Sequence, residues 1–206
     1  MRVLLINGSP HEAGCTHTAL GRVAETLEGR GVKAELYHIG KAPVGGCTAC
    51  GACGKTGRCA YNDGVNRVLE MAGGFDGFVF GAPVYYASPN GSMVAFMDRL
   101  FQAGGGALRH KPAAVVASAR RGGCTAAIDV LAKYPTINQM PLVSGDYWPI
   151  VHGNTSEQVL QDAEGMFTME TVGRDMAWLL RCIEAGRAAG IMPDIVEKEA
   201  WTNFIR

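Results

Sequence analysis

The sequence has no excess of either charge and no long run of apolar residues. It carries 19 lysine and arginine residues against 19 aspartate and glutamate residues, so its formal net charge is zero. A chain without net positive charge has no general attraction to nucleic acid or to an anionic membrane. Its apolar runs are too short to cross a bilayer, and the run Val3–Ile6 is too short for a secretory signal. We therefore expect a cytoplasmic protein that binds no nucleic acid and no membrane.

Several catalytic motifs are also missing. The chain has no His-x3-His, no Gly-x-Ser-x-Gly and no His-Glu-x-x-His pattern, which leaves hydrolase and metalloprotease functions without support. What it does have is 48% hydrophobic residues, 18% charged residues and 28 glycines. This composition is typical of a compact α/β domain with many tight turns and not of a disordered chain.

Apolar runs and helical spacing alternate along the chain. Short apolar runs that end in turn residues predict buried strands, whereas apolar residues three and four positions apart predict helices. The first predicted strand is the most apolar and the second is more polar, so the second belongs at an edge of the sheet. The predicted strands are 3–6, 32–39, 78–80, 113–117 and 135–143, and the predicted helices are 16–30, 63–72, 93–101, 123–131 and 169–183, the last ended by Gly190.

This alternation predicts an α/β sandwich of three layers, with helices on both faces of a five-stranded parallel sheet. A polar second strand beside a very apolar first strand favours the strand order 2-1-3-4-5. In a sheet of that order, ligands bind outside the carboxyl ends of strands one, three and four. The three loops at those ends are therefore the candidate site.

Each loop has features of a ligand site. The first, residues 8–18, opens a helix and carries the hydroxyls of Ser9, Thr16 and Thr18, which would bind an anion or merely cap the helix. It is neither a Walker loop nor a G-x-G-x-x-G turn. In the second, residues 82–91, two tyrosines either face a flat ring system or pack beneath the loop. The third, residues 118–123, ends in a glycine pair, where a ligand can approach the backbone closely.

Taken in order, these motifs resemble the NADPH-dependent FMN reductase family, and within it the iron–sulfur flavoproteins. The resemblance rests on Gly8-Ser9-Pro10, residues 14–18, Ala82–Tyr85 with Met97-Asp98-Arg99, and the glycine pair, within roughly the first 130 residues. It implies a flavodoxin-like fold and a bound FMN, with the phosphate in the first loop and the ring beside the other two. His11 stands where the family usually has a basic residue. The FMN-binding residues that the resemblance implies are Ser9, Pro10, His11, Cys15, Thr16, His17, Thr18, Pro83, Val84, Tyr85, Tyr86, Ala87, Ser118, Ala119, Arg120, Gly122 and Gly123.

Four cysteines, Cys47, Cys50, Cys53 and Cys59, lie close together in a glycine-rich segment. Thiolates at this spacing can bind one iron–sulfur cubane. Zinc fits less well, because structural zinc sites usually use two separated pairs of ligands, and free thiols need no metal at all. The resemblance to iron–sulfur flavoproteins implies that these four cysteines bind a [4Fe–4S] cluster.

We expect simpler roles for the other three cysteines. Cys15 lies at the start of a predicted helix, where the positive end of the helix would lower the pKa of its thiol, but its expected role is that of a small side chain that fills the loop. Cys124 and Cys182 lie on predicted helices, and we expect both in the core.

We expect one flavodoxin-like domain over residues 1–190, with a cysteine-rich insertion at 43–60 and a C-terminal tail at 191–206. The tail has apolar residues that a complete five-stranded sheet does not need, so it either folds back on its own subunit or forms an interface. The family that the chain resembles favours an interface, in a homodimer or homotetramer. These apolar residues are Ile191, Ile195, Val196, Trp201, Phe204 and Ile205.

The expected function is that of an FMN-dependent oxidoreductase. Its donor would be NAD(P)H and its acceptor a quinone, a flavin, or a nitro- or azo-compound, with the flavin and not a catalytic side chain carrying the chemistry. One alternative is an electron carrier that receives electrons from ferredoxin without reacting with NAD(P)H. Another is a flavin-binding module without turnover. Residues 145–155 have no role that the sequence assigns.

Overall fold

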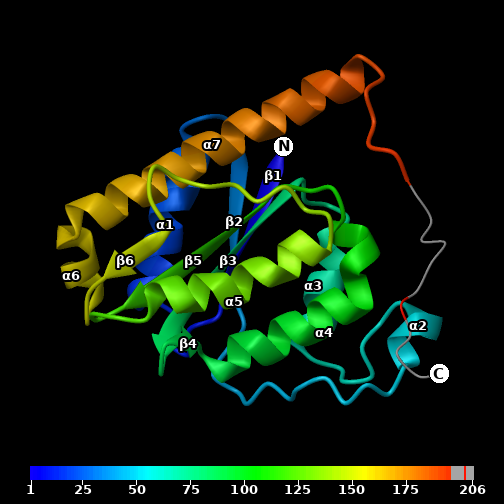
Figure 1. Cartoon of the computed structure of the whole chain (residues 1–206), viewed down its shortest axis with the longest axis horizontal. Coiled ribbons are helices and arrows are strands. Elements are labelled where there is room, and N and C mark those ends of the chain that lie inside the picture. Colours follow the sequence, from blue (N-terminus) through cyan, green and yellow to red (C-terminus); the bar gives the residue numbers. More distant parts are fainter. Residues whose placement is uncertain (196–201, 203–206) are drawn as a thin grey trace.

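A parallel sheet lies between two layers of helices in the computed structural model, which describes residues 1–195 and 202 (Figure 1). Its strand order is β2-β1-β3-β5-β6, and β4 pairs antiparallel with the end of β3. The strands are β1 (Arg2–Asn7), β2 (Lys33–His38), β3 (Gly77–Tyr85), β4 (Ser88–Pro89), β5 (Ala113–Ala119) and β6 (Ile150–His152). The helices are α1 (Cys15–Glu28), α2 (Ala52–Thr56), α3 (Gly64–Ala72), α4 (Gly91–Leu108), α5 (Cys124–Ile137), α6 (Ser156–Gln161) and α7 (Ala163–Ala188).

The helices cover the sheet on both faces. Helices α1, α6 and α7 lie on one face, and α3, α4 and α5 lie on the other (Figure 1). Strand β1 supplies both cores, because successive side chains of a strand point to opposite faces. Val3 and Leu5 join the core beneath α1 and α7, and Leu4 and Ile6 join the core beneath α3 and α4. The apolar run of β1 is therefore the central strand that the sequence predicts.

The predicted order of the five main strands is confirmed, but the predicted last strand, 135–143, is wrong. Helix α5 continues to Ile137 and includes Pro135 in its last turn. The segment that follows pairs with β5 only at the start of that strand, where Val143 N donates to the carbonyl of Ala113 (2.7 Å). The fifth strand is β6, which pairs with Ala117–Ala119.

Helix α7 ends where the sequence predicts. Gly190 has a left-handed φ of 78°, and Ile191 N donates back to the carbonyl of Gly186 (2.8 Å), as in a Schellman motif. Cys182 lies on the outer side of α7 and is exposed, so its expected place in the core is wrong, whereas Cys124 is buried as expected. No helix in the described part of the chain is both long and apolar enough to span a membrane.

The C-terminal tail is described only in part. Ile191, Met192 and Ile195 are exposed. The expectation for Val196, Trp201, Phe204 and Ile205 falls outside the described residues.

Candidate cofactor site and cysteine cavity

The first loop leaves β1 and is held in shape by its own polar groups. Ser9 N donates to Asn7 Oδ1 (3.0 Å), and His11 N donates to Ser9 Oγ (3.1 Å). Just before α4, Asn90 Nδ2 donates to the carbonyl of Gly8 (2.8 Å), while its buried Oδ1 has no partner among the described residues. The loop is therefore preformed, with one buried acceptor beside it still unpaired.

The N-terminus of α1 is open. Its N-cap is Gly14, and no side chain caps the helix, so the alternative that loop hydroxyls merely cap it is wrong. Ser9 Oγ is used by His11, and Thr18 Oγ1 donates to the carbonyl of Gly14 (3.3 Å). The first N–H groups of a helix have no partner within it, and together with the helix dipole they attract an anion. This end of α1 is thus suited to a phosphate.

The third loop meets the first through two buried hydroxyls. Thr16 Oγ1 and Ser118 Oγ lie 2.8 Å apart, and both residues are at most 3% exposed. Helix α5 begins after Gly123 and also has no side-chain cap. Two open helix N-termini therefore lie at the same edge of the sheet, at the carboxyl ends of β1 and β5.

The tyrosine loop forms a β-hairpin whose turn residues, Tyr86 and Ala87, both have positive φ (51° and 58°). Tyr85 and Tyr86 are exposed, so the alternative that they pack beneath the loop is wrong. Gly123, with φ of 94°, lies so close that an added Cβ would be 2.8 Å from Ala87 Cα. The second and third loops are therefore in contact, and the predicted residues of all three loops lie at one site.

A fourth segment at this site was not predicted from the sequence. After β6, Ser156 Oγ donates to the carbonyl of Ala13 (2.8 Å), and the thiol of Cys15 lies 3.5 Å from the carbonyl of Gly153. Burial raises the pKa of Cys15, so the expected lowering by the helix end is wrong. The available signal was Thr155, whose side chain caps α6 as a threonine before a helix often does.

The four clustered cysteines line one cavity of about 190 Å³, far from the three loops in sequence but beside α4. Cys47 and Cys50 are exposed, whereas Cys53 and Cys59 are partly buried. Within residues 1–195 and 202, no three histidine, cysteine or acidic side chains are gathered closely enough for a metal ion. The cavity thus has the donor set of a cluster site without the closed arrangement of its sulfurs.

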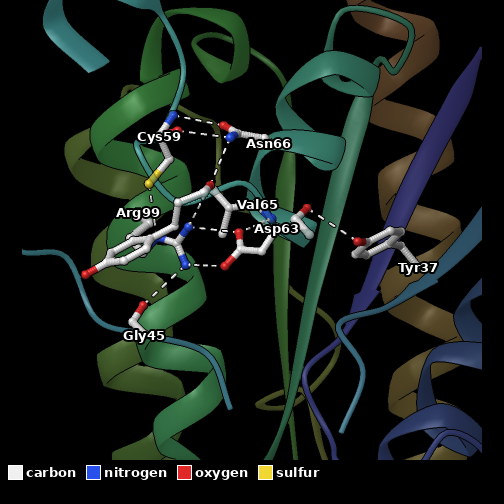
Figure 2. A network of polar contacts seen from close by, with 9 residues as sticks. Tyr37, Gly45, Cys59, Asp63, Val65, Asn66 and Arg99 are labelled. Atoms are coloured by element: carbon white, nitrogen blue, oxygen red, sulfur yellow. Dashed lines mark hydrogen bonds and ion pairs between the residues drawn. The ribbon is translucent and has the colours of Figure 1, made fainter. Parts of the chain in front are cut away.

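Cys59 has the most hydrogen bonds of the four. Its backbone N donates to Asn66 Oδ1 (2.8 Å), its carbonyl accepts from Asn66 Nδ2 (3.0 Å), and its Sγ accepts from Arg99 Nε (3.1 Å) (Figure 2). Cys50, in contrast, lies in an exposed turn between Ala49 and Gly51, both with positive φ. Four thiols around one cavity are donors of the kind that an iron–sulfur cluster takes, but among the described residues their sulfurs are not gathered around one point.

Known proteins match the chain in sequence and in fold. It is 26% identical to an iron–sulfur flavoprotein of Methanocaldococcus jannaschii, over 89% of this chain and 100% of that one. An iron–sulfur flavoprotein of Archaeoglobus fulgidus is 32% identical, over 80% and 83% of the two chains. Among solved structures, a flavodoxin, the WrbA-like protein of Agrobacterium tumefaciens, matches with a TM-score of 0.62 at 16% identity, over 88% of this chain and 97% of that one.

The fold is therefore flavodoxin-like, as the strand order and this structural match agree. The sequence profile of the NADPH-dependent FMN reductases matches residues 1–155, which is most of the chain and includes all three loops and the cysteine cavity. On this evidence the chain belongs to the NADPH-dependent FMN reductase family.

Proposed function

We propose that the protein is an FMN-dependent oxidoreductase that receives electrons from NAD(P)H and passes them to a small-molecule acceptor. The observation that carries this proposal is the pair of open helix N-termini, α1 and α5, joined by the contact of Thr16 with Ser118. Such a pair offers one place for a phosphate and a second place for negative charge on a ring. The family to which the chain belongs supports the same cofactor and the same donor.

The side chains would divide the binding of FMN among the loops. Ser9, Thr16 and the first N–H groups of α1 would bind the phosphate, because hydrogen bonds to a charged group are stronger than neutral ones. Tyr85 and Tyr86, already exposed, would contact the ring without acting as acid or base. The N-terminus of α5 would stabilise negative charge on the reduced ring. FMN itself would supply the hydride and one-electron chemistry.

The test compares FMN with FAD in calorimetry and then measures NADPH oxidation without oxygen. FMN should bind more tightly than FAD, because the first loop provides one phosphate site and no second nucleotide-binding half follows. Bound FMN should then be bleached by NADPH faster than free FMN. Tighter binding of FAD would contradict the cofactor, and bleaching no faster than that of free FMN would contradict the donor.

We propose as a second candidate an electron carrier that couples the flavin to a [4Fe–4S] cluster and accepts electrons from ferredoxin. The observation in its favour is the single cavity that Cys47, Cys50, Cys53 and Cys59 all line. The names of the relatives in Methanocaldococcus and Archaeoglobus, both iron–sulfur flavoproteins, support it. A cluster would supply one-electron transfer.

Anaerobic purification, with assays of iron and sulfide, separates the two candidates. Cys50→Ser should lower the iron content and leave FMN bound, because cavity and flavin site use different loops. Cys182→Ser, at an exposed cysteine of α7, is the control and should keep the iron. Reduction by ferredoxin but not by NADPH would favour the carrier, and an iron-free wild-type protein would contradict the cluster.

A further inference from the structure

Arg99 of α4 is buried beneath the cysteine loop, and each of its N–H groups has a partner. Its side chain is 1% exposed. An arginine has five N–H donors, and five hydrogen bonds are present here. They go to Asp63 Oδ2 (2.6 Å), Asp63 Oδ1 (2.8 Å), Cys59 Sγ (3.1 Å), the carbonyl of Gly45 (3.3 Å) and the carbonyl of Tyr61 (3.3 Å) (Figure 2).

A buried guanidinium is a poor way to stabilise a core. Taking the charge out of water is costly, and an apolar side chain of similar size is often at least as stabilising. Asp63 offsets the charge of Arg99, and the aromatic ring of Tyr61 lies 4.7 Å from the guanidinium carbon. The partners of Arg99, more than its burial, therefore indicate what it does.

Those partners come from both ends of the cysteine loop. Gly45 lies two residues before the first cysteine, and Tyr61 and Asp63 follow the last one. Arg99 thereby joins the two ends of the loop to the rigid helix α4. Asp63 also caps α3 by accepting from Val65 N (3.1 Å), so the same carboxylate fixes the exit of the loop.

The remaining donor, Nε, is directed at sulfur. It reaches Cys59 Sγ, while Asn66 holds the backbone of the same residue on both sides. Hydrogen bonds to ligand sulfurs withdraw electron density and stabilise the reduced, more negative state of an iron–sulfur cluster, which raises its reduction potential. Groups that orient metal ligands also strengthen metal retention.

We propose that Arg99 is a positioning residue for the cysteine cavity. It fixes Cys59 as the anchored ligand toward which the exposed cysteines close, and its Nε–H raises the reduction potential of the cluster bound there. This inference rests on the cluster proposed above. Neither the family profile nor the names of the relatives assign a role to this residue.

The experiment uses holoprotein prepared without oxygen. Arg99→Lys keeps the positive charge but cannot make the five directed hydrogen bonds. We expect a more negative cluster potential in a redox titration followed by electron paramagnetic resonance, and about 10- to 100-fold weaker retention of iron against a chelator. Arg109→Lys, at the exposed arginine that caps the C-terminus of the same helix, is the control and should change neither quantity.

Two further measurements separate positioning from general destabilisation. In apoprotein, Arg99→Lys should speed tryptic cleavage after Lys55 and Arg58 in the loop, at unchanged FMN affinity. Asp63→Asn keeps Arg99 but weakens its orientation, so it should shift the cluster potential in the same direction by less.

The outcomes are distinct. If the wild-type protein contains a cluster, and Arg99→Lys has the same cluster potential and the same iron retention, the role of Arg99 is overturned but the cluster is not. Weaker FMN binding and lower melting temperature at an unchanged cluster potential would also overturn it, because Arg99 would then serve the fold alone. Iron-free wild-type protein would overturn the proposed cluster itself and, with it, this role.

Discussion

The contact of Thr16 with Ser118 leads to a prediction with a defined direction. A hydroxyl has one donor and two acceptor positions. If Thr16 donates to the phosphate of FMN, it must accept from Ser118, and the 2.8 Å separation of their oxygens permits this order. The two hydroxyls would then contribute unequally to FMN affinity, although they share one hydrogen bond.

The magnitudes follow from the charge of the phosphate. Thr16→Val keeps the shape of the side chain and removes a hydrogen bond to a charged group, worth about 1.5–3 kcal/mol, or roughly 10- to 150-fold in Kd. Ser118→Ala removes only a neutral bond, worth about 0.5–1.5 kcal/mol, so FMN affinity should fall by roughly 10-fold at most. Because both hydroxyls are buried, each single variant also leaves the other without its partner.

The assay is a double-mutant cycle. FMN affinity is measured by quenching of flavin fluorescence, and the stability of the apoprotein by urea unfolding. The double variant should lose less free energy of unfolding than the two single variants lose together, because it leaves no hydroxyl without a partner. Equal losses of FMN affinity in the two single variants, or no loss in Thr16→Val, would refute the donation from Thr16 to the phosphate.

Three other predictions concern the glycine of the third loop, a buried thiol and the tail. Gly123→Ala should destabilise the protein by about 1–3 kcal/mol in urea unfolding, because the φ of Gly123 is 94° and the new Cβ would meet Ala87. The control is Gly122→Ala, which should be nearly neutral because the space around Gly122 is open. Burial raises the pKa of Cys124 from its ordinary 9.0 to about 11, so as the pH rises the thiol ionises first in the unfolded chain. The free energy of unfolding should therefore fall between about pH 9 and 11, and more steeply in wild type than in Cys124→Ala. Equal slopes in the two proteins would contradict this. Truncation after Gly190 should shift a dimer toward monomer in sedimentation and weaken FMN binding, while full-length protein that sediments as a monomer at micromolar concentration would contradict the proposed interface.

The sheet could be predicted because its strands differ clearly in apolar character. The buried runs of β1, β3 and β5 and the polar edge strand β2 determine the order and therefore the edge at which the loops meet. Strand β6 could not be found in this way, because three residues are too few to show a periodicity. Pro135 begins the segment 135–143, in which the sequence predicted a short strand, but it lies within the last turn of α5, which continues to Ile137.

Contacts within the candidate site could not be predicted from the sequence. Sequence motifs located all three loops, but the hydroxyl pair and the approach of Gly123 to Ala87 depend on tertiary distances. Arg99 appeared in the sequence only as part of a family motif. Its partner Asp63 lies 36 residues earlier, so no local pattern joins them.

The contacts around the first loop also bear on the order in which the protein folds. The loop is held by Ser118, Gly153 and Ser156, which lie 102, 138 and 143 residues beyond their partners in the chain. Contacts over such separations form slowly, because a long segment must first be ordered. During synthesis, the contacts around the start of α1 cannot be complete until residue 156 has left the ribosome. A nascent chain would therefore have most of its sheet before it has a place for a nucleotide, and cofactor binding would report on the completion of folding.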